Sequence, residues 1–267
     1  MSRLFDVTRQ GYSQYVKSLV KPCKYAGLLA AIQAIIDEDE FNDAYGRVRL
    51  TPAIALKGIQ VSQSKVYRVC NKFGLLQKKR KPKGLTKVDK AAKRDADLLC
   101  GNFAADEPNK KLIGGITQLP TADGTLYIAS VYDCFDSECT GLAMADNMRD
   151  ELTQDALKMA AKRYSIKGAI FHSDFGSQCT SNEFKKLAKK LKIRQSMSLA
   201  KLSCYGNAKC ESIFGRFKVE AIYDRYDTKN MSMDAVKMLV FRYFMGYWNN
   251  RRISTANGGL PPAVKIL

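Results

Sequence analysis

The sequence has very little histidine and no close pairs of cysteines. Its only histidine is His172, and its eight cysteines never form a Cys-x-x-Cys pair. A zinc module of the Cys/His type needs four ligands in close pairs, so we expect none. We expect the scattered cysteines to be small buried hydrophobic residues.

Long apolar runs are absent as well. No stretch of the sequence reaches the roughly 18 consecutive apolar residues of a membrane-spanning helix. The first residues, MSRLFDVTRQGYSQY, lack the apolar block of a secretory signal. The sequence therefore predicts a cytoplasmic protein.

Negative charge is scarce relative to positive charge. The chain has 44 Lys and Arg against 26 Asp and Glu, which gives a formal net charge of +18 and a pI of about 9.5. Such an excess favours a polyanionic partner. The 267 residues, 46% of them hydrophobic, are enough for one large domain and a small one.

The first part of the chain has the pattern of a pair of helices joined by a turn. Apolar residues recur at helical spacing over 26–36 and 64–76. Between these segments, Pro52 suits a first helical turn, Gly58 a helix end and Ser62 an N-cap. This order predicts a helix-turn-helix-like DNA-binding region, with an ordinary helical hairpin as the alternative.

In such a region the second helix enters the DNA groove. Its spacing predicts an outward face with Gln63, Lys65, Arg68 and Lys72. Its buried face is predicted to consist mostly of Val66, Tyr67 and Val69. Lys65, Arg68 and Lys72 are therefore candidate DNA-binding residues.

Residues 77–94 are strongly basic, with nine Lys or Arg against Asp89 alone. Low hydrophobicity, Pro82 and Gly84 predict a linker between two domains. Basic side chains on phosphates release counterions and raise affinity without reading sequence. The candidate DNA-binding residues here are Lys78, Lys79, Arg80 and Lys81. A merely solvated linker is the alternative.

From residue 105 onward, short β-like runs separated by turns predict a sheet. The turn PTADG (120–124) joins the first two runs as a hairpin, and a third run follows. A helix over 151–164 then leads to a buried strand over 168–174, which predicts a parallel crossover. The remaining segments predict helices packed on the sheet, so 105–267 forms an α/β domain.

Two acids stand out because of their positions. Asp174 ends the predicted strand, and Glu211 lies near the start of a predicted helix. Ligands of open α/β sheets bind beyond the carboxyl ends of the strands. Asp174 could equally cap the following turn, and Glu211 could complement the helix N-terminus. Position alone leaves both interpretations open.

The segments around these acids resemble a known family. FHSDFGSQCTSNEF (171–184), CYGNAKCESIFGRFKVE (204–220) and WNNRRIS (248–254) resemble the IS-three family of bacterial insertion-sequence transposases. That family typically shows HSD-x-G-x-QYTS, CYDNA-xx-ES-F and YNNRR at these places. Upstream, AYGRVRLT (44–51) and GIQVSQSKVYRVCNKFGLL (58–76) are similar to its second reading frame. The resemblance runs essentially from end to end.

This resemblance implies an RNase H-like core of the retroviral integrase type, a mixed sheet with flanking helices. The implied domains are a helical region over 1–76, a basic linker over 77–104 and the catalytic core over 105–267. It further implies an Asp, Asp, Glu triad that holds two Mg²⁺ ions, with Asp174 as the second Asp and Glu211 as the Glu. Two such ions activate a nucleophile and stabilise the leaving oxygen, and oxygen ligands suit Mg²⁺.

The first catalytic position departs from the family. Where the family has W-x-x-DIT, this sequence has LIGGIT, which places Gly115 at the first Asp. Folding the hairpin about residue 122 predicts that Gly115 lies opposite residue 129. Asp133 is then about 13 Å farther along the strand, too far to share two ions. Asp123 lies in the turn and is a poorer substitute.

Further departures surround this position. Gly206, Cys179, Leu112 and Ser254 stand where the family has Asp, Tyr, Trp and often His. Together they indicate an impaired copy. The alternative is that the Gly-Gly strand bends and that a displaced acid completes the site.

Lys218 and His172 are placed near the acids by their spacing. Lys218 follows Glu211 by two helical turns on nearly the same face. The resemblance implies that it contacts the DNA backbone, with a solvated lysine as the alternative. His172 shares the strand face of Asp174, and we expect it to support the site or contact DNA rather than bind Mg²⁺.

Three functions follow from the resemblance. The first is a transposase that cleaves element ends and joins them to target DNA, impaired here by Gly115. The second is a non-catalytic DNA-binding relic or inhibitor of transposition. The third, an RNA/DNA-hybrid nuclease on the same fold, is disfavoured by the basic N-terminal helices. The implied partners are duplex DNA (terminal repeats and target), the product of the upstream reading frame and further copies of this chain. The resemblance also implies association with the bacterial nucleoid and not with a membrane.

Overall fold

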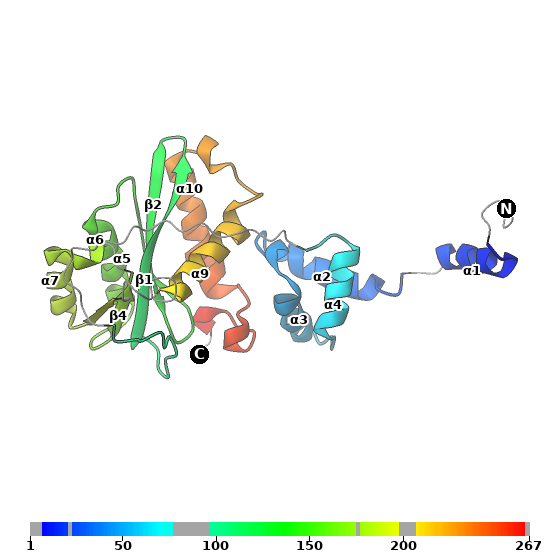
Figure 1. Ribbon diagram of the computed structural model, residues 1–267, viewed down its shortest axis with the longest axis horizontal. Helices are drawn as coiled ribbons and strands as arrows, with labels where there is room; N and C mark the ends of the chain where they lie inside the picture. Colours follow the sequence, from blue (N-terminus) through cyan, green and yellow to red (C-terminus); the bar gives the residue numbers. More distant parts are fainter. Residues whose placement is uncertain (1–6, 21–22, 77–96, 175–176, 198–206, 265–267) are drawn as a thin grey trace. The chain divides into compact units, whose positions relative to one another are not determined.

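A computed structural model describes residues 7–20, 23–76, 97–174, 177–197 and 207–264 of the chain. They belong to two compact units, Met1–Leu76 and Gln77–Leu267. Figure 1 labels the main helices and strands of both units.

The first unit is helical. Its described elements are α1 (Arg9–Val20), α2 (Ala26–Asp37), the 3-10 turn η2 (Asn42–Ala44), α3 (Arg47–Leu56) and α4 (Gln63–Lys72). Helix α3 ends at the predicted glycine: Gly58 has a φ of +80°, and its N–H donates to the carbonyl of Ala55. Helix α4 begins as predicted, because the Ser62 hydroxyl accepts a hydrogen bond from the N–H of Lys65.

Two details of the predicted helix-turn-helix region are wrong. Helix α3 begins after Gly46, so Pro52 lies inside the helix rather than in its first turn. Tyr67 is 42% exposed, and Cys70 is buried instead. Residues three and four apart share a helix face, so the buried face of α4 consists of Val66, Val69 and Cys70. The outward face is exposed as predicted at Gln63, Lys65, Arg68 and Lys72.

The second unit is built on a five-stranded sheet with the order β3-β2-β1-β4-β5. Its strands are β1 (Lys111–Thr121), β2 (Gly124–Asp133), β3 (Cys139–Ala145), β4 (Ile170–Ser173) and β5 (Arg194–Met197). β1, β2 and β3 are antiparallel, whereas β4 pairs with β1, and β5 with β4, in parallel. The predicted antiparallel start and crossover are confirmed. The sequence does not predict β5, because its four residues, RQSM, show no clear hydrophobic pattern.

The remaining elements of this unit are mostly helical. The helices are α5 (Asp150–Arg163), α6 (Ser177–Thr180), α7 (Asn182–Leu191), α9 (Ala208–Phe217) and α10 (Met233–Phe241). The π-helical segments are η4 (Lys218–Ile222) and η6 (Arg242–Trp248), and the 3-10 turns are η5 (Thr228–Asn230), η7 (Thr255–Asn257) and η8 (Pro262–Val264). No described helix in either unit is long and apolar enough to cross a lipid bilayer.

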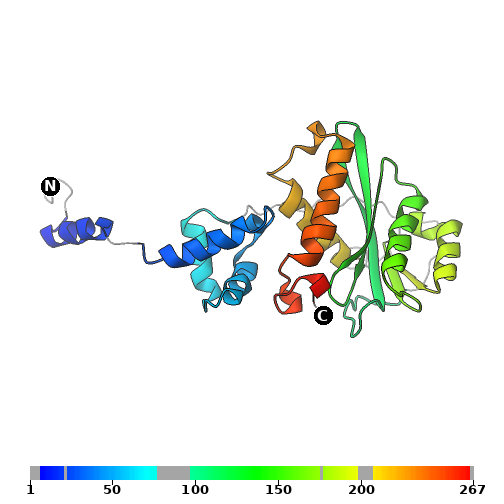
Figure 2. The same ribbon diagram turned by 180° about the vertical axis from the view of Figure 1, so that it is seen from behind.

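The helices cover both faces of the sheet. α5, α6 and α7 lie on one face and α9, α10 and η6 on the other (Figures 1 and 2). On the first face, Leu112, Val131 and Phe171 pack in one core cluster with residues of α5 and α7. Gly141 allows α5 to approach β3, because a Cβ at Gly141 would lie 2.0 Å from the carbonyl oxygen of Ala156.

The register of the first hairpin differs from the prediction by one residue. The loop has two residues, so Thr121 pairs with Gly124 and Gly115 lies opposite Ser130 rather than residue 129. A one-residue shift matters in a sheet because successive side chains point to opposite faces. Asp133 therefore lies opposite Leu112.

Aromatic rings fill the second face and surround a buried ion pair. The rings in contact are Tyr132, Phe214, Phe217, Tyr243, Phe244 and Trp248. Both oxygens of the Glu220 carboxylate accept hydrogen bonds from the Arg252 guanidinium, each at 2.8 Å. The Tyr243 hydroxyl donates to the same carboxylate at 2.7 Å. The geometry is bidentate, which is the strong form of an Arg–carboxylate pair.

The segment WNNRRIS (248–254) holds the C-terminal helices against the sheet. Asn249 accepts a hydrogen bond from the N–H of Cys139 and donates one to its carbonyl, each at 2.9 Å. Trp248 donates through its indole N–H to the carbonyl of Ser137 at 2.8 Å. Together with Arg252, these contacts give this segment a structural role.

Residues 97–104, the end of the predicted linker, pack against the sheet. Leu99 is buried, and the ring of Phe103 makes an edge contact with His172 at a centroid distance of 6.0 Å. The N–H of Leu98 donates to the Ser196 hydroxyl at 2.9 Å. This part is therefore not a linker, and the rest of the predicted linker, 77–96, lies outside the described residues.

The substitution Arg252→Met is expected to lower the free energy of unfolding by about 3–5 kcal/mol, because it leaves the Glu220 carboxylate buried without its partner. Urea denaturation followed by circular dichroism measures the loss. The matched control is Arg251→Met at the exposed neighbour, which should change stability by less than about 0.5 kcal/mol. Equal losses for the two variants would contradict the structural role of the buried pair.

Candidate active site

Asp174 and Gly115 occupy neighbouring positions on adjacent parallel strands. β4 pairs with β1 in register up to Ser173 with Gly114. Asp174 follows directly after β4, Gly115 is the next residue on β1, and neighbours in register share one face of a sheet. Asp174 is half-buried at the carboxyl end of β4, where the sequence predicts it.

The face of Gly115 is turned toward helix α9. A Cβ built on Gly115 would lie 2.8 Å from the Sγ of Cys210. The same Cβ would lie 3.4 Å from Asn207 Nδ2 and 3.4 Å from Phe214 Cε2. Non-bonded carbon atoms pack at about 3.5–4.0 Å, so the distance to sulfur is too short. The Cys210 thiol therefore fills the space in which a side chain at position 115 would begin.

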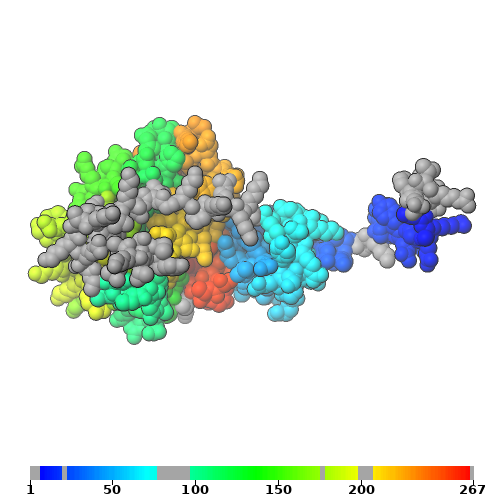
Figure 3. Space-filling model, viewed as in Figure 1, coloured from blue at the N-terminus to red at the C-terminus, as the bar shows by residue number. Residues whose placement is uncertain are grey.

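Glu211 lies in the first turn of α9 and is exposed. The yellow segment that contains α9 reaches the surface of the second unit in Figure 3. Burial is the main cause that raises the pKa of the Cys210 thiol, and the charges of Asp174 and Glu211 raise this pKa further. Asp174 from β4 and Glu211 from α9 therefore both lie close enough to act on the thiol beside Gly115.

Asp133 cannot replace the missing acid because it belongs to the other face of the sheet. Its partner in register, Leu112, packs in the core beneath α5, whereas Gly115 faces α9. The Asp133 carboxylate accepts hydrogen bonds from the N–H groups of Asn109 at 2.7 Å and Phe135 at 3.0 Å. Burial raises the pKa of this carboxyl, and these hydrogen bonds partly offset the rise. Asp133 thus orders the loops at Asn109 and Phe135. Its position on the opposite face of the sheet, in addition to its separation from Gly115 along the strands, excludes it from the site.

Among the described residues, no third carboxylate is grouped with Asp174 and Glu211. Within the described ranges, no group of three or more His, Cys, Asp or Glu side chains is placed to hold a metal ion. Asp123 lies in the hairpin turn and accepts a hydrogen bond from the N–H of Met233 at 2.7 Å. The raised pKa keeps the Cys210 thiol protonated, and Mg²⁺ requires oxygen ligands. The residues present at this place do not fit a two-ion site.

Asn207 is a site residue that the sequence analysis missed. Its side chain is buried and donates through Nδ2 to the carbonyl of Gly114 at 3.0 Å. The main-chain carbonyl of Asn207 accepts a hydrogen bond from the main-chain N–H of Glu211 at 3.1 Å. Asn207 therefore fixes the start of α9 against β1 beside Gly115. The signal was available, because Asn207 belongs to the family-like motif CYGNA.

Lys218 and His172, the two basic residues predicted to lie near the acids, differ in burial. Lys218 follows the last residue of α9, is half-buried, and has its pKa lowered by desolvation. His172 is fully buried, and its Nδ1 lies 2.8 Å from the Ser196 hydroxyl. The predicted alternative that His172 contacts DNA is wrong, because β5 and residues 97–103 cover its ring. His172 instead supports the strand that carries Asp174.

The other departures from the family pattern are largely buried. Leu112 is fully buried in the core beneath α5. Burial raises the pKa of the Cys179 thiol to about 12, and the charge of Asp174 contributes. The seven described cysteines are free and five of them are buried, as predicted for most. Outside the described residues lie Gly206 and the candidate DNA-binding residues Lys78, Lys79, Arg80 and Lys81.

Comparisons with known proteins agree with this architecture. The family model of the integrase core domain matches residues 105–201. Transposase InsF for insertion sequence IS3A of Escherichia coli (strain K12) is 32% identical over 96% of this chain and 83% of its own length. The transposase for insertion sequence element IS904 of Lactococcus lactis is 31% identical over 80% of this chain and 84% of its own.

A solved structure of the HTLV-2 integrase catalytic core domain in complex with magnesium aligns with a TM-score of 0.40. The identity is 14%, over 59% of this chain and 95% of that chain. The integrase core match and the mixed five-stranded sheet confirm the RNase H-like, integrase-type architecture preceded by helices. The chain belongs to the IS3-type family of insertion-sequence transposases and carries their integrase core domain.

Proposed function

We propose that this chain binds element ends and target DNA as a transposase subunit, but does not by itself cleave DNA or transfer strands. The observation that carries the proposal is the 2.8 Å separation between Cys210 Sγ and the position of a Cβ on Gly115. The Cys210 thiol lies against the position at which the side chain of the first triad acid would begin. Asp174 and Glu211 are the two remaining acids of the triad.

In the family, two divalent ions held by the triad activate the attacking hydroxyl and stabilise the leaving oxygen. Asp174 and Glu211 supply oxygen ligands of the type that Mg²⁺ prefers, but two carboxylates without the third do not bridge two ions. This chain is therefore expected to retain recognition and lack the chemical step.

The second candidate is an active transposase in which another carboxylate completes the site. The placement of Asp133 on the opposite face of the sheet argues against the nearest such acid. The non-catalytic reading allows the chain to act on transposition by occupying ends or by joining active subunits. Its partners would be terminal repeats, target DNA, the product of the upstream reading frame and further copies of the chain on the bacterial nucleoid.

DNA binding is supported by charge on both units. In the first unit, α4 exposes Lys65, Arg68 and Lys72 on one helix that begins at a well-formed N-cap. The basic run at 77–94 adds non-specific affinity. In the second unit, the half-buried Lys218 directly follows α9, the helix that carries Glu211. These residues are the proposed contacts to the DNA backbone.

Replacing Lys78, Lys79, Arg80 and Lys81 with Gln is expected to flatten the salt dependence of duplex binding. Each lost phosphate contact lowers the slope of log K against log salt by about 0.9. The measurement is fluorescence anisotropy of a labelled duplex over a salt series. The matched control replaces Lys57, Lys158, Lys229 and Lys237 with Gln. It removes the same amount of charge elsewhere in the chain. A slope that changes equally in both variants would remove the basic run from the interface.

Restoring the acid is expected to restore cleavage only in part. Gly115→Asp supplies the carboxylate but drives its Cβ against Cys210, and a displacement of about 1 Å at a reacting centre can cost on the order of a hundredfold in rate. Gly115→Asp with Cys210→Ala removes the collision and is expected to cut faster than Gly115→Asp alone. The measurement is cleavage of a duplex carrying the element ends, in Mg²⁺ and in Mn²⁺.

Two further variants complete this experiment. Cys210→Ala alone should be as inactive as the unmodified chain, and Glu211→Ala added to the double variant provides the blank. An increase in melting temperature on addition of Mn²⁺, seen for the double variant alone, would report ion binding independently of cleavage. Cleavage by the unmodified chain at the rate of Gly115→Asp would show that another carboxylate completes the site.

A further inference from the structure

A second basic surface lies on the first face of the second unit, at the end of α7. It consists of Lys167, Lys189, Lys190 and Lys192, all exposed, and is called the α7 basic surface. The N–H of Gly168 donates to the carbonyl of Lys192 at 2.8 Å, which brings the segment before β4 beside the end of α7. Charges from two separate segments of the sequence therefore meet at one place.

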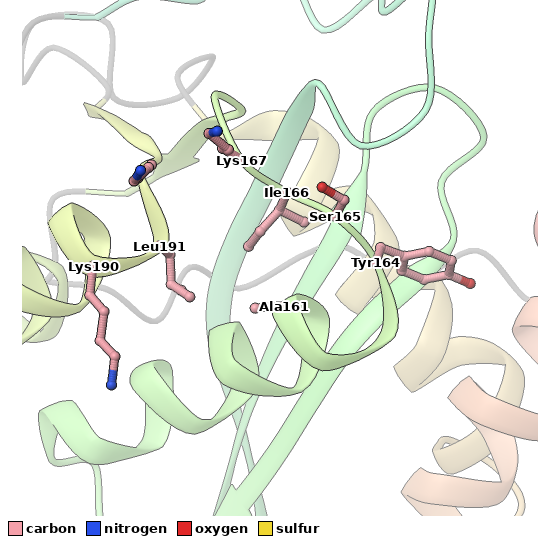
Figure 4. Close-up of a pocket in the computed structure, with 8 residues that line it drawn as sticks. Ala161, Tyr164, Ser165, Ile166, Lys167, Lys190 and Leu191 are labelled. Atoms are coloured by element: carbon pink, nitrogen blue, oxygen red, sulfur yellow. The ribbon is translucent and has the colours of Figure 1, made fainter.

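The α7 basic surface borders a shallow hollow of about 280 Å³ (Figure 4). Lys167, Lys190 and Lys192 line it together with Tyr164, Ser165 and Leu191. Lysine ammonium groups around a shallow polar depression suit an extended anion such as a phosphate backbone, which needs point charges rather than an enclosed pocket.

Within the part of the chain that the structure describes, no acid neutralises the charges of this surface. Lys186, one turn away on α7, pairs with Glu183 at 2.7 Å. In the described parts of the chain, by contrast, none of the four residues of the surface forms an ion pair with an acid. Lys167, Lys190 and Lys192 line one hollow and their like charges repel one another, so the arrangement favours a polyanionic partner.

Helix stabilisation explains only part of the surface. Lys189 and Lys190 lie in the last turn of α7, where basic side chains complement the helix dipole. Lys167 lies outside α7. Lys192 caps the helix with a φ of 56°, a conformation that glycine or asparagine usually adopts at this position.

The surface is separate from the candidate active site. It lies at the amino ends of β4 and β5, whereas Asp174 follows the carboxyl end of β4. Six residues join Gly168 to Asp174, which at about 3.3 Å per residue gives roughly 20 Å. A phosphate held at the hollow is therefore not the one that would react at Asp174.

We propose that the α7 basic surface is a further contact to the backbone of duplex DNA, beyond the phosphodiester that faces Asp174 and Glu211. The proposal rests on the proposed function, because it assigns an additional part of the same DNA-binding protein. The contact reads no bases and acts through counterion release.

The experiment compares two double variants of the full chain. Lys167→Gln with Lys190→Gln removes two charges from the hollow, and Lys229→Gln with Lys237→Gln removes two charges elsewhere on the same unit. Duplex affinity is measured by fluorescence anisotropy over a salt series, and circular dichroism checks the fold of each variant. The hollow variant should lower the salt slope by about 1.8 and the control variant should leave it unchanged.

The outcomes separate this proposal from the proposed function. If the unmodified chain shows no salt-dependent duplex binding, the proposed function fails. If the unmodified chain binds but the hollow variant and the control variant have equal slopes, the α7 basic surface makes no DNA contact. A second variant, Lys167→Glu with Lys190→Glu, should weaken binding further than the Gln variant, and equal affinity for the two would also overturn the proposal.

Discussion

Helix α9 packs against β1 through the bare backbone of Gly115 and the buried thiol of Cys210. Asn207 strengthens the same contact by a hydrogen bond to the carbonyl of Gly114. The contact sets where α9 begins, and hence where Glu211 lies relative to the end of β4. A Cβ at position 115 would lie 2.8 Å from Cys210 Sγ, so an acid at this position requires the thiol to shift.

The segments that resemble the family contain two groups of residues with different surroundings. Asp174 follows β4 and Glu211 lies in the first turn of α9, whereas Glu220, Asn249 and Arg252 hold the C-terminal helices against the sheet. The structural contacts are buried and satisfied, and they do not depend on a bound ion. The absence of an acid at position 115 is therefore compatible with a fully packed fold.

Much of the local structure could be predicted because it follows from short-range rules. Ser62 and Gly58 are confirmed as the start of α4 and the end of α3, since capping depends on neighbouring residues. The placement of Asp174 directly after a buried strand follows from the apolar run that precedes it. The short strand β5 and the burial of Cys70 in place of Tyr67 were not accessible in this way, because packing against distant elements decides them.

The sequence by itself determined that position 115 carries no carboxylate, that Asp174 ends a strand and that the chain is strongly basic. These are properties of residue identity and local pattern. Only the tertiary structure decided that Cys210 fills the space beside Gly115, that Asp133 faces the opposite layer and that His172 is covered. The physical reason is that strand register and helix packing bring together residues far apart in the chain, and a shift of one residue turns a side chain to the other face of the sheet.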